Sequence, residues 1–312
     1  MLARPVAAER VRRVNPAGEE PALAPMSLHD CRITARRRTA RWSDDEVTAA
    51  DAMDFWAFAA GPANVIMQLS WPPVGYGVVE SKVDSGNLLK HPWKRARTTF
   101  QYLAVAILGS AEDRTAFRAA VDGAHRHVKS EPGSPVRYNA FDPRLQMWVA
   151  ACLFVGLEDA YQLLRGELTD EQAEEFYRSA WTLGTTLQVS EEQWPPTRTD
   201  FDDYWTTACR NVAIGDTVRD YLRDLVGLKM INPVLGLPFR PLVKFLTAGF
   251  LAPVFRDALG LGWGPTRQFS FEMLFLVVAF ANRFLPVFIR QGGSYLLLVD
   301  VRRRVAANKR LI

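Results

Sequence analysis

The stretch DPRLQMWVAACLFVGLEDAYQLL, residues 142–164, decides the fold class of this chain. Its apolar positions 145, 148, 149, 152 and 153 recur with the period of an α-helix. Asp142 followed by Pro143 is a typical helix start, because a carboxylate can accept a backbone N–H and proline suits the first turn. The pattern predicts a long helix that belongs in the core.

The segments before this stretch are also helical in pattern. Pro92 opens the run PWKRARTTFQYLAVAILG, and Gly109 is placed to end it. Ser110 and Asp113 then form a capping pair for a helix that we expect to run to about Ser130. Strand-like alternation is scarce along the chain, so the predicted fold class is all-α.

Length and composition favour one domain. With 312 residues, of which 48% are hydrophobic and 23% charged, the chain can bury one large core, and no linker divides it. We expect residues 46–312 to form a single large helical domain. Residues 1–45 are expected to form a flexible basic arm.

The N-terminal stretch and the cysteines indicate a compartment. MLARPVAAERVRRVNPAGEE carries arginines but lacks the apolar core of a secretory signal. Cys31, Cys152 and Cys209 are far apart in the sequence, which matches neither a disulfide framework nor a cysteine-rich zinc site. We therefore expect a cytoplasmic protein.

The charge distribution argues against nucleic acid as a partner. The net charge is +4, and much of the excess lies in ARRRTAR at 35–41 and VRRRVAANKR at 301–310. The sequence has neither a basic stripe with interleaved aromatic residues nor a zinc-finger spacing. Basic tails of this kind are typically solvated or loosely attracted to a membrane surface.

One late segment has the length of a membrane span. FSFEMLFLVVAFANRFLPVFI, residues 269–289, is interrupted by Glu272, Asn282, Arg283 and Pro286. We expect it to form a buried helix of the core, and peripheral contact with a membrane is the alternative that stays open.

Two of the four histidines lie in VDGAHRHVKS, residues 121–130. On a helical wheel of about 100° per residue, His125 and His127 fall on opposite flanks of the apolar stripe, so they cannot bind one metal ion together. A multi-histidine metal site is therefore not expected. A single histidine can still be the axial ligand of a haem iron, because the porphyrin supplies the other four ligands.

A set of short motifs resembles a known family. The domain shared by the rubber oxygenases (latex clearing protein) and the mycophenolic-acid-pathway oxygenase is similar to this chain, in the same order, at RARTTFQYLAVAILGS, VDGAHRHVKS, YNAFDPRLQMWVAACL, LTDEQAEEFYRSAWTLG and WPPTRTDFDDYW. The resemblance covers roughly residues 55–290. It implies an all-helical fold that holds haem b through a histidine and uses oxygen to attack a lipophilic, often isoprenoid, substrate.

The resemblance also implies site residues. It makes His125 the proximal ligand of the haem iron, with Lys129 four residues later on the same helix face. Lys94, Arg97 and Thr98 match a basic-plus-threonine motif, in which Arg97 points about 100° away from the face shared by the other two. We expect Thr98 and Arg97 to orient bound oxygen or a haem propionate. Lys94 and Lys129 would be propionate partners.

Departures from the family pattern accompany these matches. The rubber oxygenases have a lysine where this chain has Arg97, and an arginine stays cationic and cannot coordinate iron. Many members carry a histidine in a W-V-H-A motif, at the position of Ala150 here. Glu80 corresponds to a glutamate with a general-base role in the rubber-cleaving branch, and we expect it to be an acid/base group.

The resemblance therefore predicts a haem b-dependent oxygenase that uses dioxygen or a peroxide to oxidise or cleave a hydrophobic small molecule. Two alternatives stay open. Asp200 and Asp203, preceded by Glu191 and Glu192, have a spacing that could hold magnesium in a terpenoid-synthase-like enzyme. An all-α protein with an apolar cavity could also be a non-catalytic carrier of lipids or terpenoids.

Overall fold

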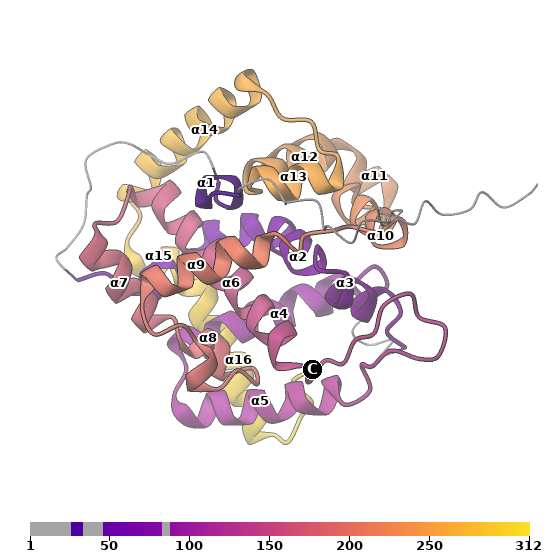
Figure 1. Ribbon diagram of the computed structural model, residues 1–312. Helices are drawn as coiled ribbons and strands as arrows, with labels where there is room; N and C mark the ends of the chain where they lie inside the picture. The colour runs from indigo at the N-terminus through magenta and orange to yellow at the C-terminus, as the bar shows by residue number, and fades with distance from the viewer. Residues whose placement is uncertain (1–25, 34–45, 83–87) are drawn as a thin grey trace, which may run out of the picture.

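The computed structural model describes residues 26–33, 46–82 and 88–312 of the chain (Figure 1). Its helices are α1 (Leu28–Cys31), η1 (Ala49–Ala52), η2 (Phe55–Ala60), α2 (Gly61–Leu69), α3 (Pro72–Val79), α4 (Pro92–Leu108), α5 (Ala111–His125), α6 (Pro143–Arg165), α7 (Asp170–Ser179), α8 (Thr182–Thr185), η4 (Glu191–Gln193), α9 (Arg198–Cys209), α10 (Asp216–Val226), α11 (Pro233–Gly236), η5 (Leu237–Phe239), α12 (Arg240–Gly249), α13 (Pro253–Leu259), α14 (Pro265–Arg283), α15 (Val287–Arg290) and α16 (Gly292–Ala306). Within these described ranges, the only β pairing is an isolated bridge between Lys129 and Asn139. The predicted all-α fold is confirmed.

Helix α6 is the centre of the molecule, as the sequence pattern predicted (Figure 1). Asp142 caps it by accepting the backbone N–H of Arg144 at 2.9 Å, and Pro143 occupies its first turn. The helix packs against α2, α8, α14, η1 and η2. In the described part of the chain it is the one helix long and apolar enough to cross a bilayer, and 83% of its apolar window is buried inside the protein. It is therefore a core helix.

Three stacked tryptophans join α6 to its neighbours. The rings of Trp71 and Trp148 lie 4.6 Å apart, and those of Trp148 and Trp205 lie 5.1 Å apart, both pairs nearly parallel. Each indole N–H donates to a backbone carbonyl, at Ala208, Gln68 and Cys31 respectively. Because every indole N–H is satisfied, these large rings can lie in the core without leaving a buried donor unpaired.

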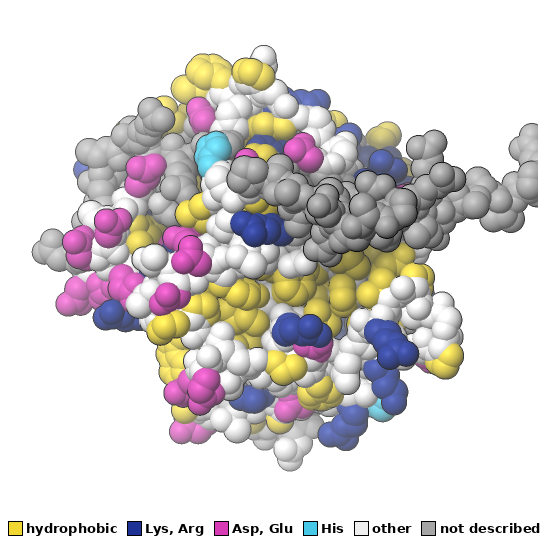
Figure 2. Space-filling view, viewed as in Figure 1, with side chains coloured by type: hydrophobic (Ala, Val, Ile, Leu, Met, Phe, Trp, Pro, Cys, Tyr) yellow, Lys and Arg dark blue, Asp and Glu magenta, His cyan; other side chains and the backbone are white. Residues whose placement is uncertain are grey.

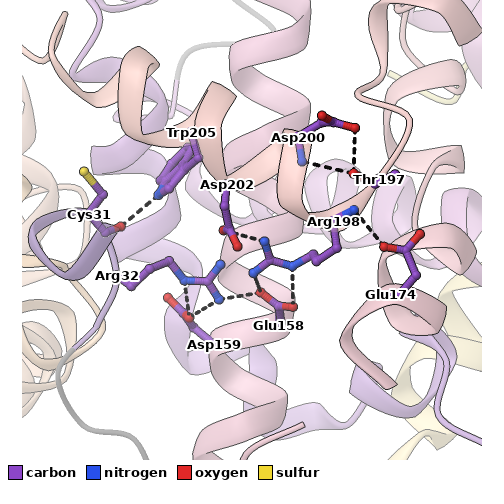
Figure 3. A network of polar contacts seen from close by, with 10 residues as sticks. All are labelled: Cys31, Arg32, Glu158, Asp159, Glu174, Thr197, Arg198, Asp200, Asp202 and Trp205. Carbon is purple, nitrogen blue, oxygen red and sulfur yellow. Dashed lines mark hydrogen bonds and ion pairs between the residues drawn. The ribbon is translucent and has the colours of Figure 1, made fainter. Parts of the chain in front are cut away.

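The structure describes only part of the predicted N-terminal arm. Its residues 1–25 and 34–45 lie outside the described residues, but residues 26–33 include α1, which packs against α9 and α13. The fully buried Arg32 explains this order (Figure 3), since it donates to Glu158 at 2.5 Å and to Asp159 at 2.6 Å. Arg198 donates to the same Glu158 at 2.9 Å. Both carboxylates belong to α6, so this short segment is latched to the central helix.

The prediction that segment 269–289 forms a buried core helix is wrong, because most of its side chains are not buried. On α14 only Phe271, Phe275, Ala279 and Asn282 are buried. The helix lies at the edge of the molecule (Figure 1), and hydrophobic side chains are visible over it in the space-filling view (Figure 2). The segment is apolar over its whole length because α14 has two apolar faces. One face packs inward and the other faces solvent.

Candidate functional site

Helix α5 places His125, and its first turn fixes the helix at the opposite end. Ser110 and Asp113 form the predicted capping box, in which Asp113 Oδ2 accepts the Ser110 N–H at 2.9 Å. Arg302 of α16 donates to Asp113 at 2.7 Å, and the buried side chains of Phe117 and Val121 pack α5 on the core. His125 is the last residue of this helix.

The helix therefore ends five residues earlier than we expected, and this changes the position of Lys129. Ala140 donates its backbone N–H to the Val128 carbonyl at 2.9 Å, and Ser130 donates to Tyr138 at 2.8 Å. This pairing holds residues 128–130 in an extended conformation. Lys129 is exposed and does not share a helix face with His125, so that prediction is wrong.

The imidazole of His125 is half-buried and lies against two other elements. Its Nδ1 is 3.3 Å from Nε2 of Gln146, which also donates to the Ala140 carbonyl. The ring of Phe141 meets the imidazole edge-on, with 6.4 Å between the ring centres. Gln188, whose amide nitrogen donates to Asp122 of α5, interacts with the imidazole from another side. We call His125, Gln146, Gln188 and Asp122, together with Arg95, the histidine site.

Burial lowers the pKa of His125, and the nearby cation of Arg95 lowers it further. Gln188 and Asp122 act in the opposite direction, but the net shift is downward. The imidazole is therefore mostly neutral at pH 7, which is the form of histidine that binds a metal. His127, two residues later, is exposed to solvent.

The cation of α4 that acts on His125 is Arg95. We had predicted Lys94 and Arg97 for the haem site. Tyr102 donates to the Leu183 carbonyl of α8, and Arg95, seven residues earlier, lies on the same side of the helix. Tyr221 of α10 also interacts with Arg95, and its half-buried ring interacts with the backbone of Leu88 as well. The sequence interpretation missed Arg95. The i, i+3, i+7 spacing of Arg95, Thr98 and Tyr102 was the signal that could have found it.

The predicted motif residues Lys94 and Arg97 lie on other sides of α4 than Arg95, about 100° and 160° away from it around the helix. Gln101 lies near both of them around the helix, and its amide donates to Asp300 of α16 at 2.6 Å. Arg97 is one turn before Gln101 and Lys94 two turns before it. The Nε atom of Arg97 is buried and finds no hydrogen-bond partner in the described part of the chain. Thr98 is buried, and its hydroxyl donates to the Arg95 carbonyl at 3.0 Å.

Glu80 braces the loop after α5 and has no described contact with the imidazole. Its Oε2 accepts hydrogen bonds from Ser134 at 2.7 Å and from the Tyr138 hydroxyl at 2.9 Å. Burial and the Glu80 carboxylate together raise the pKa of Tyr138 to about 12. The carboxylate thus ties the end of α3 to the segment that terminates the histidine helix.

The cavities bear on where a ligand could bind. A cavity of about 50 Å³ lies between α2, α4 and α6, and its lining is mostly apolar, with Asn64, Gln68 and Thr99 as its polar members. A shallow depression of about 300 Å³ lies at residues 262–267. Neither one includes His125. Ala150, at the position of the family's second histidine, is fully buried in α6.

The acidic residues that could have bound magnesium do not form a shared site. Asp200 accepts the Thr197 hydroxyl at 2.6 Å in the first turn of α9, and Asp203 is exposed. In the described ranges, no group of three or more His, Cys, Asp or Glu side chains could hold a metal ion. The geometry therefore gives the magnesium alternative no support.

The cysteines lie closer together than their sequence spacing suggests. All three are buried free thiols. The side chains of Cys31 and Cys209 interact, and burial raises the pKa of Cys209 well above its usual range. A buried neutral thiol is a poor nucleophile, so these residues are core groups here.

Comparisons with known proteins agree with the motif order. The family described as "ER-bound oxygenase mpaB/B'/Rubber oxygenase, catalytic domain" matches residues 51–280. An uncharacterized protein of Mycobacterium tuberculosis is 48% identical over 254 residues, which cover 80% of this chain and 98% of that protein. An uncharacterized protein of Mycobacterium bovis matches with the same identity and coverage. No solved structure matches the chain significantly.

Proposed function

Because the chain belongs to the family of mpaB-type and rubber oxygenase catalytic domains, we propose that it is a haem b-dependent oxygenase with His125 as the axial ligand of the iron. Dioxygen or a peroxide would be the oxidant, and a hydrophobic small molecule, isoprenoid or lipid-like, would be oxidised or cleaved. The observation that carries the proposal is the half-buried imidazole at the end of α5, which lies against Gln146 and Phe141.

The donor set of the histidine site fits an axial haem ligand. Such a ligand binds iron through one ring nitrogen, while the other nitrogen donates its proton to a neighbouring group. The carboxamides of Gln146 and Gln188 lie beside the imidazole, and each offers an amide donor and an amide acceptor. The Gln188 Oε1 atom is buried and lacks a partner among the described residues. It can therefore accept a ring N–H.

Haem propionates need cations, and α4 offers two sets of them. Arg95 is the cation that acts on His125. Arg97, with its buried Nε unpartnered in the described structure, is a donor that a carboxylate could satisfy. Lys94 would be a further propionate partner. A bound haem would supply the oxygen chemistry, and the protein groups would hold the iron, pair the propionates and exclude water.

A hydrophobic substrate agrees with the apolar cavity between α2, α4 and α6, which Phe100 and Leu103 of α4 line. At about 50 Å³, it is smaller than the roughly 300 to 1,000 Å³ of most ligand pockets. The small volume gives little support to the alternative of a lipid or terpenoid carrier.

The decisive experiment is an absorption spectrum of the protein expressed with an ample supply of haem. We expect a Soret band, and His125→Ala should lose it or bind added haem at least about tenfold more weakly. His127→Ala is the matched control, because this exposed histidine lies two residues away, and its spectrum should equal that of the wild type.

Each other result has a defined meaning. Absence of a Soret band would overturn the haem proposal. A band unchanged in His125→Ala would keep the haem and reject the ligand. Turnover of a prenyl diphosphate that depends on magnesium in haem-free protein would favour the terpenoid-synthase-like alternative.

A further inference from the structure

The exposed hydrophobic side chains of this protein are concentrated in one part of the chain. Of the 22 large ones in the described structure, 18 lie between residues 234 and 299. Surface hydrophobic residues scattered singly are normal, whereas contiguous apolar patches usually mark a binding surface. The concentration therefore needs a physical explanation.

Helix α14 carries the largest share. Except for Leu274, the exposed apolar residues of α14 and its C-cap form a stripe about 100° wide on a helical wheel: Phe269, Met273, Leu276, Val277, Phe280 and Phe284. Four of these are more than half exposed, and Phe284 reaches 68%. We call this stripe, together with Val287, Phe288 and Ile289 of α15, the apolar face.

The opposite side of α14 is firmly anchored, so the orientation of the apolar face is fixed. The buried Phe271 packs against the rings of Phe245, Phe250 and Trp263. Asn282 donates to the buried Asp54 at 3.1 Å. The helix cannot rotate to hide its outer stripe without breaking these contacts.

A second group of exposed apolar side chains lies on the neighbouring elements α11, η5 and α12. Val234 is 82% exposed, and Leu235, Leu237 and Phe239 are each more than half exposed. Helix α12 contacts α14, whereas α11 lies beyond α12 and α13 as seen from α14 (Figure 1), so this group is separate from the apolar face.

The charges around these elements are mainly positive. Arg240 and Lys244 lie on α12, and Arg267 and Arg283 lie in the first and last turns of α14. Residues 231–299 also hold Arg256, which is buried, and Arg290, which pairs with the buried Asp54, so these four are the cations at the surface, against the two exposed carboxylates of Asp257 and Glu272. A surface with this composition complements a partner that is apolar inside and anionic at its boundary.

We propose that the apolar face is a membrane-docking surface, with which the protein seats α14 and α15 in the interfacial layer of an anionic bilayer. Helices that lie in this layer place Phe and Leu among the acyl chains and Lys and Arg at the headgroups. A second copy of the chain is the less suitable occupant, because it would bring the same excess of cations to the interface. The inference is independent of haem, since vesicle binding is measured without turnover.

The test is flotation of the full chain with vesicles of phosphatidylcholine, with and without phosphatidylglycerol. We expect the wild type to float with the anionic vesicles. The pair Phe280→Ser and Phe284→Ser should weaken this partitioning by at least about tenfold, because two large side chains no longer enter the acyl layer. Trp93→Ser is the matched control, since Trp93 is 77% exposed but lies on α4, and its partitioning should stay unchanged.

A second variant tests the charges. Lys244→Gln with Arg267→Gln should reduce binding to anionic vesicles, and added salt should have the same effect on the wild type. Far-UV circular dichroism and thermal melting establish that each variant is folded.

The proposal is overturned if the wild type does not float, or if the folded phenylalanine pair floats equally well. It is also overturned if the wild type is a dimer that the phenylalanine pair dissociates while vesicles are not bound. In that case a second copy covers the face.

Discussion

The side-chain nitrogen of Gln146 lies 3.3 Å from Nδ1 of His125, although 21 positions separate the two residues in the sequence. The contact joins the last residue of α5 to the first turns of α6. The core helix α6 therefore contacts the imidazole through the side chain of Gln146. The histidine site is therefore supported by the most buried element of the fold.

The first prediction concerns the titration of His125. Its pKa in the folded protein should lie below the ordinary value of about 6.5, because burial and the cation of Arg95 both disfavour the charged imidazole. The C2–H resonance of the ring, followed by NMR against pH, measures this. Arg95→Gln should raise the midpoint. Arg126→Gln removes a cation that is next to His125 in the sequence but is not among the groups that shift its pKa, so this control should leave the midpoint nearly unchanged.

The same shift makes stability depend on pH. The unfolded chain binds a proton at this histidine near pH 6.5, whereas the folded protein binds it only at lower pH. The contribution of His125 to stability is therefore fully present above about pH 6.5 and is lost as the pH falls through the folded-state value. A folded-state midpoint at or above about 6.5 in the wild type would contradict this account.

The second prediction concerns the latch between α1 and α6. Arg32→Met should lower the free energy of unfolding by about 3 to 5 kcal/mol, because it leaves Glu158 and Asp159 buried with one cation fewer. Burial raises the pKa of Glu158, but the guanidiniums of Arg32 and Arg198 outweigh it and hold the pKa below its usual range. Urea denaturation measures the loss.

Arg178→Met is the control for this experiment. Arg178 pairs with Glu174 at 2.9 Å on the surface, where its side chain is 72% exposed, so we expect a loss of at most about 0.5 kcal/mol. Equal effects of the two substitutions would show that residues 26–33 are not held by the buried pairs.

The third prediction concerns the histidine that this chain lacks. Ala150 is fully buried in α6, and an imidazole there would overpack the core and bury a polar ring. Ala150→His should lower the free energy of unfolding by about 2 to 4 kcal/mol, and haem binding should not improve. A haem titration and urea denaturation of the same variant check both statements. Tighter haem binding with unchanged stability would show that this position still belongs to a haem pocket.

Features that depend on neighbouring residues in the sequence could be predicted. The start of α6 at Asp142 and Pro143 and the capping box of Ser110 with Asp113 both follow from local chemistry, and both are present. The apolar period of residues 145–153 placed the central helix correctly because it reflects burial on that helix alone.

Features that depend on distant residues could not be predicted. The end of α5 at His125 is set by the pairing of residues 128–130 with 138–140, which no helical period reveals. The buried position of Arg32 depends on carboxylates 126 and 127 residues away. Segment 269–289 has two apolar faces, and the pattern alone does not show which one the core uses.

The last prediction tests how tightly the apolar face is held. A Cβ atom at Gly249 of α12 would lie 2.2 Å from two ring atoms of Phe271, which is fully buried. The ring has little room to move, because the rings of Phe250 and Phe275 lie 5.4 Å and 4.7 Å away, centre to centre. Gly249→Ala should therefore cost about 1 to 3 kcal/mol of unfolding free energy, which exceeds the roughly 1 kcal/mol that alanine gains over glycine in a helix.

Gly262→Ala is the matched control, since a Cβ atom at Gly262 would meet no described atom within 4 Å, and the stability of this variant should stay within about 0.5 kcal/mol of the wild type. Guanidinium denaturation of both variants measures the difference. If Gly249→Ala were as stable as Gly262→Ala, α14 could shift outward at no cost. The orientation of the apolar face would then be adjustable, and docking on a membrane would not require the rigid seat that Phe271 provides.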